Sequence, residues 1–408
     1  MTAGEFGMVL EERSIRPSNE ELERMVARPK TLDHAYGFDD VAIVPGAVTT
    51  NPDLAIPSFT LGEHTLRIPI IASSMDGVVD PKFAIKMSKL GGMAVLNLDG
   101  VWARYEDADA ALDEIAAAPM HEATATIQRI YSEPVKEHLV GQRVEEIKAG
   151  GGIAVVAGTP QNTKRFAPIT KDAGTDFFVV ASTVTTARHL SSSLKGLQLD
   201  ELVKQMAGIP ILVGNTVDFQ ATLELMETGV HGVLVGVGPG AACTSREVLG
   251  IGMPQVSATI ETAYARDVYF ERTGRYVPII TDGGLRTGGD VSKSICAGAD
   301  AVMIGSPFAS CEGAPGRGFH WGMATPHAML PRGVRVEVGQ THNVEKLLFG
   351  PTSRTDGSEN LVGALTTSMS TCGAQTIQEF HDARMIIAPS IKTEGKIYQI
   401  SQTRHAGI

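Results

Sequence analysis

The sequence predicts an α/β fold, a (β/α)8 barrel with an N-terminal arm, a helical insertion after the second strand and a long C-terminal loop segment. Eight short apolar runs recur along the chain, and helical stretches lie between most of them. A doubly wound sheet is the alternative. Eight strands without a dinucleotide-binding glycine fingerprint favour the barrel.

The predicted strands are nearly continuous apolar runs rather than alternating ones, which is typical of parallel strands buried on both faces. They span residues 68–72, 93–97, 153–157, 177–181, 209–214, 233–237, 278–281 and 301–304.

Local stop and start signals predict helices between these strands. Asp80 and Pro81 are expected to begin one helix, because proline is favoured at the first helical position, and Gly91 is expected to end it. A second helix is expected within residues 215–229.

Two regions depart from regular alternation. Residues 98–152 are expected to form a helical insertion, too short for a second domain of ordinary size, with helices at 105–117, 122–132 and 135–148. Residues 307–408 form a Gly/Pro-rich segment with one expected helix near 360–370. Because long loops at a barrel's end usually serve the active site, residues 307–380 are predicted to be an active-site loop region.

The first 30 residues are expected to form an arm, in which Ser18 begins a capping box and a short helix ends before Pro29. We therefore predict a single catalytic domain over residues 1–408.

Charge and composition exclude several classes of partner. The net charge is −11 and the pI is near 5.5, which argue against nucleic acid and against an anionic membrane surface as partners. We find no apolar run as long as a membrane span and no signal peptide. The four cysteines show no metal-binding or disulfide spacing, so we expect a reduced, cytoplasmic setting.

The loop after the sixth strand carries the most informative motif. Residues 236–246 read Gly-Val-Gly-Pro-Gly-Ala-Ala-Cys-Thr-Ser-Arg, a glycine-rich backbone that can curve around an ion or a phosphate. Cys243 is expected at the mouth of the barrel, where its thiolate would be a nucleophile favoured by Arg246 and helix N-termini. A small buried hydrophobe is the alternative for any cysteine; it is our interpretation of Cys296, and we expect structural roles for Cys311 and Cys372.

A phosphate site is expected after the seventh and eighth strands. Asp282 and Gly284 follow one strand, and Gly305 and Ser306 follow the other. Glycines and the N–H of Ser306 at these two ends are placed as in the phosphate site of many barrels. Glycines that serve only as turns are the alternative. His320 is a further candidate for phosphate contact in an exposed-looking His320-Trp321 pair, whereas Trp321 is expected to pack in the core.

These residues resemble the IMP dehydrogenase/GMP reductase family over roughly residues 33–380. The cysteine loop is similar to the catalytic loop of that family. Further segments match in order: Phe38-Asp-Asp-Val-Ala-Ile-Val-Pro45, Ile68-Pro-Ile-Ile-Ala-Ser-Ser-Met-Asp76, Ile211-Leu-Val-Gly-Asn-Thr-Val217, Ile280-Thr-Asp-Gly-Gly-Leu-Arg286, Ala297-Gly-Ala-Asp-Ala-Val-Met-Ile-Gly-Ser306 and Gly322-Met323-Ala324 with Ala328-Met329.

The resemblance implies an NAD-dependent oxidation of IMP to XMP in guanine nucleotide synthesis. Cys243 would attack C2 of the purine, and water would hydrolyse the covalent intermediate. It also implies a homotetramer and potassium as a monovalent cation. The residues implied for the nucleotide are Ser73, Met75, Asp282, Gly284, Gly305, Ser306, Gly322 and Met323. Those implied for the cofactor are Asn215, Ser182 and Gly236, and those for the cation are the carbonyls of Gly238, Gly240 and Cys243.

The chain departs from the family pattern at several positions. The insertion at 98–152 stands where most IMP dehydrogenases carry regulatory CBS modules, so we expect no CBS domains in this chain. Ala181 replaces the aspartate that holds the cofactor ribose, and Ala241 replaces a phosphate-contacting serine. The mobile flap is nearly absent, and the acidic-glycine ending that completes the cation site is not evident in residues 404–408.

Arg332 is the departure that bears most on mechanism, since it stands where the family has Glu or Gln. We hypothesise that Arg332 activates water or anchors the base, with Thr244 or His327 assisting; a surface salt bridge is the alternative. GMP reductase is the second candidate activity, because the Gly-Pro-Gly and Cys-Thr-x-Arg features look reductase-like. A catalytically silent nucleotide-binding regulator is the third.

Overall fold

The computed structural model describes residues 32–189, 196–322 and 334–389. By its internal contacts the chain divides into residues 1–34 and residues 35–408, and every described helix and strand lies in the second unit. The predicted N-terminal helix at Ser18 lies outside the described residues.

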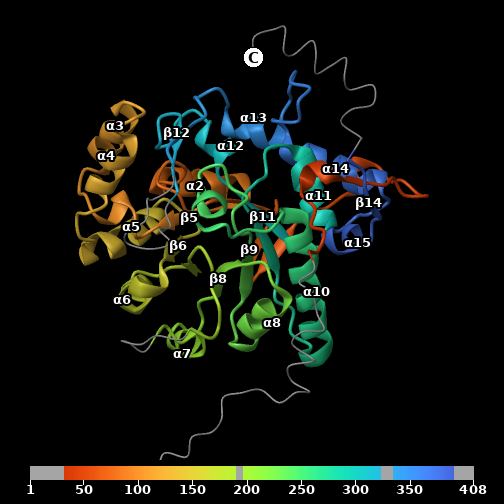
Figure 1. Ribbon diagram of the computed structural model, residues 1–408, viewed down its shortest axis with the longest axis horizontal. Helices are drawn as coiled ribbons and strands as arrows, with labels where there is room; N and C mark the ends of the chain where they lie inside the picture. Colours follow the sequence, from red (N-terminus) through yellow and green to blue (C-terminus); the bar gives the residue numbers. More distant parts are fainter. Residues whose placement is uncertain (1–31, 190–195, 323–333, 390–408) are drawn as a thin grey trace, which may run out of the picture. The chain divides into compact units, whose positions relative to one another are not determined.

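Eight parallel strands close into a barrel in the order of the chain, which confirms the predicted (β/α)8 fold (Figure 1). The strands are β4 (Ile70–Ala72), β5 (Met93–Asn97), β6 (Val155–Gly158), β7 (Phe177–Ala181), β8 (Ile211–Thr216), β9 (Gly232–Val235), β10 (Ile279–Asp282) and β11 (Ala301–Ile304). Each overlaps one of the eight predicted runs. Their apolar side chains are buried, because the barrel interior covers one face and the helices cover the other.

Helices follow most strands and cover the barrel from outside. They are α2 (Pro81–Leu90), α6 (Pro160–Asp172), α7 (Leu199–Gln205), α8 (Phe219–Glu227), α10 (Gln255–Thr273) and α11 (Gly288–Cys296). The start and end predicted for α2 are confirmed. The Asp80 side chain accepts a hydrogen bond from the Phe83 amide at 2.6 Å, and Gly91 ends the helix at φ 92°.

The helix expected within residues 215–229 begins later than its first predicted residue. Asp218 caps α8 by accepting from the Ala221 amide at 2.8 Å, and β8 extends to Thr216. Asn215 is therefore a strand residue, because the capping side chain lies three residues further along the chain.

The helical insertion lies between β5 and β6. It contains the short helix η3 (Val101–Ala103) and three helices, α3 (Ala108–Ala117), α4 (Ala123–Ile130) and α5 (Glu137–Ala149). The three helices coincide with the three predicted ones to within a few residues. α5 packs against α2 and α6, and α3 and α4 lie farther out on the same side (Figure 1).

The segment after β11 contains more helices and strands than predicted. The expectation of a single helix in it is wrong. It contains α12 (Ser306–Ala309), α13 (Val344–Phe349), α14 (Leu361–Thr371) and α15 (Ile377–His381), with strands β12 (Phe319–His320), β13 (Val336–Glu337) and β14 (Met385–Ile387). α14 is the predicted helix. The others are too short to show a helical period in the sequence.

Early residues pair with late ones. β1 (Val41–Ile43), which follows η1 (Phe38–Asp40), is antiparallel to β14. η2 (Pro52–Leu54) packs against α14, and β2 (Phe59–Leu61) and β3 (His64–Leu66) form a hairpin. The segments before β4 and after β11 thus support each other beside the barrel.

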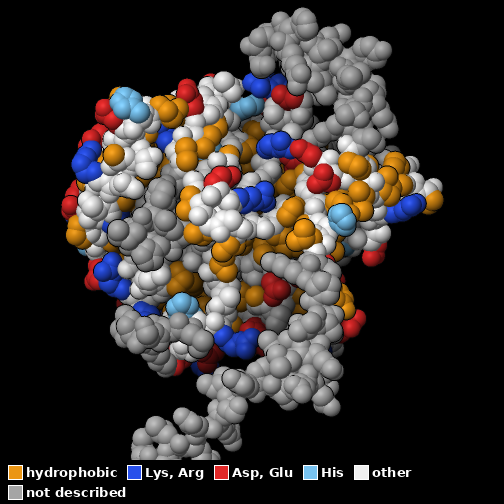
Figure 2. Space-filling view, in the orientation of Figure 1, with side chains coloured by type: hydrophobic (Ala, Val, Ile, Leu, Met, Phe, Trp, Pro, Cys, Tyr) orange, Lys and Arg blue, Asp and Glu red, His pale blue; other side chains and the backbone are white. Residues whose placement is uncertain are grey.

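The visible surface mixes charged and apolar side chains, with apolar ones gathered near β14 (Figure 2), where Ile386 and Ile387 are exposed. Within the described ranges, no helix combines the length and apolarity needed to cross a membrane.

Candidate active site

A cavity of about 330 Å³ opens at the carboxyl end of the barrel. Its lining comes from residues at or just after the ends of all eight barrel strands, together with His320 at the end of β12 and Gly322 just after it. In parallel barrels this end is where loops from different strands converge, so it is the expected place for an active site.

The cavity brings together every predicted site residue that lies within the described ranges. These are Ser73, Met75, Ser182, Asn215, Gly236, Gly238, Gly240, Cys243, Thr244, Asp282, Gly284, Gly305, Ser306 and Gly322. Met323 and Arg332 lie outside the described residues, as does His327.

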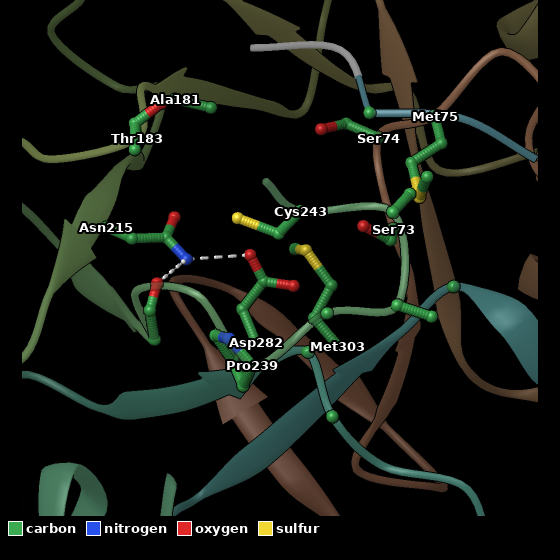
Figure 3. A pocket seen from close by; sticks show the side chains of 18 of the residues that line it. Ser73, Ser74, Met75, Ala181, Thr183, Asn215, Pro239, Cys243, Asp282 and Met303 are labelled. Carbon is green, nitrogen blue, oxygen red and sulfur yellow. Dashed lines mark hydrogen bonds between the residues drawn. The ribbon is translucent and has the colours of Figure 1, made fainter. Parts of the chain in front are cut away.

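The cysteine loop connects β9 to α9 (Ser245–Leu249). The backbone N–H of Cys243 donates to the Gly240 carbonyl at 3.0 Å, which curls the loop into a turn before the cysteine. The sulfur of Cys243 lies 3.3 Å from the Ser245 hydroxyl and faces the cavity toward Asn215 and Asp282 (Figure 3). The thiol is thus held at the mouth of the barrel, as predicted.

Arg246 supports this loop from its other side. Its guanidinium donates to the Met253 carbonyl at 2.9 Å. A Cβ on Gly238, which has φ 82°, would lie 2.7 Å from Cγ of Arg246, and so would a Cβ on Gly252. Glycine is needed at Gly238 for both its left-handed backbone and this close packing. An influence of Arg246 on the thiolate stays a prediction.

A β-bulge aims Asn215 into the cavity. The register between β8 and β9 shifts between Gly214 and Thr216, which leaves Asn215 as the extra residue. Its side-chain nitrogen donates to Oδ2 of Asp282 and to the Gly236 carbonyl, both at 2.9 Å (Figure 3). Asn215 thereby joins the ends of β8, β9 and β10.

Asp282 is the carboxylate on which this arrangement centres. Burial raises the pKa of Asp282 to about 6, and the hydrogen bond from Asn215 opposes that rise. The group therefore changes charge near neutral pH. A carboxylate with one oxygen held by an amide and the other facing a cavity is suited to accept hydrogen bonds from a ligand's hydroxyl groups.

The predicted phosphate loops lie on neighbouring strands of the barrel. Gly284 has φ 80°, and a Cβ there would lie 3.1 Å from Cβ of Pro239 in the cysteine loop. A Cβ on Gly305 would lie 3.0 Å from the sulfur of Met75. Both glycines therefore keep backbone exposed where side chains would fill the space, which suits close approach of an anion to N–H groups.

His320 is buried, which corrects the expectation of an exposed pair. His320 is 2% exposed and Trp321 is fully buried, because β12 packs against α12 and against Gly77 in the loop after β4. Nε2 of His320 lies 2.9 Å from the Ser306 hydroxyl, while among the described residues Nδ1 has no partner. Burial lowers the pKa of His320 to about 4. The core position predicted for Trp321 is confirmed.

The other cysteines lie outside the cavity lining. Cys296 is buried in α11, as interpreted from the sequence, and burial raises the pKa of its thiol to about 12. Burial raises the pKa of Cys311 to about 12 as well, and raises that of the half-buried Cys372. Cys243 is thus the cysteine placed for chemistry.

Sequence reasoning missed the side of the cavity formed by β5 and β6. Asn97 ends β5, Asp99 lies two residues beyond it, and Thr159 follows β6. Asp99 accepts from the Thr159 amide at 2.6 Å and from Asn162. A polar residue after a buried strand is the signal that identifies these positions. Ser245 was also missed, although its place two residues after the cysteine puts its hydroxyl beside the thiol.

Gln255, at the start of α10, joins the carboxyl ends of β9 and β10 through its side chain. Its side-chain nitrogen donates to the carbonyls of Val235 at 2.6 Å and Asp282 at 3.2 Å. A Cβ on Gly236 would contact Gln255 and the Asp282 carbonyl, so this glycine is required for the packing. Nothing in the sequence indicates that Gln255 is buried.

Across the described ranges, no cluster of three or more His, Cys, Asp or Glu side chains is placed to bind a metal. The cation site predicted at Gly238, Gly240 and Cys243 uses backbone carbonyls instead. The Gly240 carbonyl already accepts one hydrogen bond, and a carbonyl oxygen has a second lone pair. The binding of a monovalent ion by this loop stays a prediction.

Comparison with known proteins agrees with this geometry. A family model described as "IMP dehydrogenase / GMP reductase domain" matches residues 35–397. An uncharacterized oxidoreductase of Mycolicibacterium smegmatis is 35% identical, covering 88% of this chain and 98% of that protein. Inosine-5'-monophosphate dehydrogenase of Cryptosporidium parvum is 27% identical over 86% of this chain and 91% of its own.

A solved structure has the same fold. The crystal structure of an IMP dehydrogenase/GMP reductase-like protein from Corynebacterium glutamicum superposes with a TM-score of 0.82 at 31% identity. The match covers 88% of this chain and 95% of that one.

Proposed function

The chain belongs to the IMP dehydrogenase/GMP reductase family, and from that premise we propose that it oxidises IMP to XMP with NAD through a covalent bond to Cys243. One observation supports this most. The Cys243 thiol faces the Asn215–Asp282 pair across a cavity that also holds the two glycine loops (Figure 3).

In the proposed reaction, the Cys243 thiolate forms a bond to C2 of the purine. The chemistry that NAD would supply when bound is the acceptance of the hydride from C2. Water then attacks C2 of the remaining Cys243–purine adduct, the C–S bond breaks, and the thiolate is restored as XMP forms. The balance is one IMP, one NAD⁺ and one water to one XMP, one NADH and one proton. Ser245 lies beside the sulfur and can hydrogen-bond to the thiolate.

The nucleotide would lie between β4, β10 and β11. Asp282 would accept hydrogen bonds from the ribose hydroxyl groups. The backbone at Gly284, Gly305 and Ser306 would hold the phosphate. Met75 and Ser73 line the same wall. Gly322, with Met323 beyond the described residues, would contact the purine edge through the backbone.

The cofactor side of the cavity lies at the ends of β7 and β8. Ala181, Ser182 and Thr183 line it, and Ser182 is held to β8 by two backbone hydrogen bonds of 2.9 and 3.0 Å. On this side the cofactor would be bound by hydrogen bonds to the hydroxyl groups of Ser182 and Thr183 and not to a carboxylate. Asn215 and Gly236 would lie at its nicotinamide end, and a potassium ion at Gly238, Gly240 and Cys243 would steady the cysteine loop.

Activation of water is assigned to Arg332 and Thr244. Thr244 lines the cavity next to the thiol. An arginine acts as a base only in an unusual environment, so the alternative role for Arg332 is to anchor the base, with Thr244 or His327 assisting.

GMP reductase is the second candidate, since Thr244 and the Gly-Pro-Gly turn look reductase-like. One assay separates the activities. Purified protein is given IMP with NAD, or GMP with NADPH, and the absorbance of reduced nicotinamide is followed. A rising signal supports the dehydrogenase, and a falling signal supports the reductase. No change in either mixture, together with nucleotide binding in a calorimeter, supports a silent regulator.

We also propose that the chain forms a homotetramer in the cytoplasm. Exposed apolar side chains on α10, Ile260 and Tyr264, are one turn apart and suit a contact between copies. Light scattering that gives the mass of a monomer at micromolar concentration would refute this part.

A further inference from the structure

A buried hydrogen-bonded chain of three side chains joins the helical insertion to two walls of the cavity. The Tyr131 hydroxyl donates to Oδ2 of Asp76 and accepts from Nε1 of Trp321 at 2.9 Å. Asp76 and Trp321 are fully buried, and Tyr131 is 6% exposed. We call this set the Asp76–Tyr131–Trp321 relay.

Each end of the relay is adjacent to residues that line the cavity. Asp76 directly follows Met75, and Trp321 lies between His320 and Gly322. Tyr131 comes from neither wall, because it caps the end of α4 in the insertion. One hydroxyl group of the insertion therefore bridges two loops, which are also joined by the backbone hydrogen bond from the Gly316 amide to the Gly77 carbonyl at 3.1 Å.

The insertion is anchored on Asp76 at a second point. The Val101 amide, where η3 begins, donates to Oδ2 of Asp76 at 2.6 Å. A Cβ on Gly100 would overlap the Asp76 carboxylate, so only glycine permits this approach. The start of the insertion and the end of α4 thus converge on one carboxylate beside the cavity.

Contacts between α3 and the β12–β13 hairpin hold the same wall. The buried Arg335 donates to the Ile115 carbonyl at 2.5 Å, and its guanidinium carbon lies 4.4 Å from the centre of the Phe319 ring. Arg317 pairs with Asp109 and Asp113 at 2.7 Å each, but these carboxylates are exposed. Exposed ion pairs contribute little to stability, so the connection between α3 and this wall depends mainly on the buried Arg335.

We propose that Tyr131 is a positioning residue and that the insertion braces the nucleotide-binding loops through the relay. In this chain the insertion would set the separation between the Ser73–Met75 wall and the His320–Gly322 wall. The nature of the ligand rests on the proposed function, whereas the bracing itself rests on the relay alone. A buried hydroxyl that satisfies two partners is costly to remove, because both partners then lose a bond.

The test compares two changes at the same end of α4. Tyr131→Phe removes the bridging hydroxyl. Tyr105→Phe is the matched control, because the Tyr105 hydroxyl donates to the Ile130 carbonyl at 2.8 Å and touches neither loop. Hydrogen exchange of the free protein is followed by mass spectrometry in segments 73–79 and 316–322. Protected amides there include Val78 and Val79, which donate to the Met75 carbonyl at 2.8 and 2.9 Å.

We expect Tyr131→Phe to speed exchange in both segments by about tenfold and to weaken IMP binding in calorimetry by a similar factor, as loss of a buried hydrogen bond implies. Tyr105→Phe should change neither. Unchanged exchange in Tyr131→Phe, or equal acceleration in the control, would overturn the relay. If Tyr131→Phe does not fold, Asp76→Asn replaces it, and the same comparison with Tyr105→Phe decides.

The two proposals fail separately. Wild-type protein that binds neither IMP nor GMP refutes the proposed function, and the exchange measurement on free protein still decides the relay. Normal nucleotide binding with no exchange difference between Tyr131→Phe and wild type refutes the relay and leaves the function standing.

Discussion

Asn215 donates a hydrogen bond of 2.9 Å to the carboxylate of Asp282, from a strand that is not adjacent to β10 in the barrel. The same nitrogen reaches the Gly236 carbonyl on β9, which lies between them. These two hydrogen bonds of the Asn215 side chain hold the Asp282 carboxylate in place near the Cys243 sulfur (Figure 3). The chemistry proposed for this cavity depends on that placement.

Loss of the Cys243 thiol should abolish turnover without abolishing nucleotide binding. Cys243→Ala is expected to lower kcat by at least about 10³-fold, because removing a nucleophile removes the covalent route. Cys372→Ala is the control, since this half-buried cysteine lies outside the cavity lining. Steady-state assays and calorimetry with IMP measure the two effects. A Cys243→Ala enzyme that keeps its turnover would rule out the covalent step.

Nucleoside affinity should fall as the pH drops through about 6. Burial raises the pKa of Asp282 from 3.8 to about 6, so the carboxylate is present above that pH and is lost below it. The neutral acid is a weaker acceptor for ribose hydroxyl groups. Calorimetry with inosine is the measurement, because the phosphate of IMP itself titrates near pH 6. Asp282→Asn should bind weakly with a flat profile between pH 5 and 7, and a wild-type profile equally flat would contradict the assignment.

A second carboxylate beside Asp282 should move this transition upward. Asn215→Asp replaces an amide donor by a like charge, which raises the pKa of Asp282 further, by at least about one unit. Asn97→Asp is the matched control. It adds the same charge to the same cavity from β5, a strand that is not adjacent to β10. The fall in inosine affinity should occur at higher pH in Asn215→Asp than in Asn97→Asp. Coincident pH profiles would show that the contact between residues 215 and 282 does not affect the pKa of Asp282.

A methyl group at Gly305 should occupy the space predicted for phosphate. Its Cβ would lie 3.0 Å from the Met75 sulfur and 3.8 Å from Cβ of Ser73. Gly305→Ala is expected to weaken IMP binding by about tenfold, the cost of losing one good hydrogen bond to a charged group. Gly289→Ala in α11 is the control, since its Cβ meets only Thr287 Oγ1 at 3.6 Å. IMP affinities within twofold of each other for the two variants would place the phosphate elsewhere.

Local patterns in the sequence were enough to predict the barrel and the parts of the cavity lining that follow β4, β8, β9, β10 and β11. Eight continuous apolar runs are a local property, and burial on both faces is the physical reason that they form parallel strands. The capping of α2 by Asp80 and Gly91 is equally local. Since barrel strands end at one rim, the residue that follows each strand could be assigned to that rim from the sequence.

Long-range packing decided the rest. The bulge that turns Asn215 toward Asp282 depends on the register between β8 and β9, which no local pattern encodes. The burial of His320 depends on the packing of β12 against α12 and the loop after β4, and the pairing of β1 with β14 joins residues more than three hundred positions apart. The sequence by itself therefore determined which strand ends meet around Cys243. The tertiary structure alone decided which side chains touch there, because those contacts form between segments that are distant along the chain.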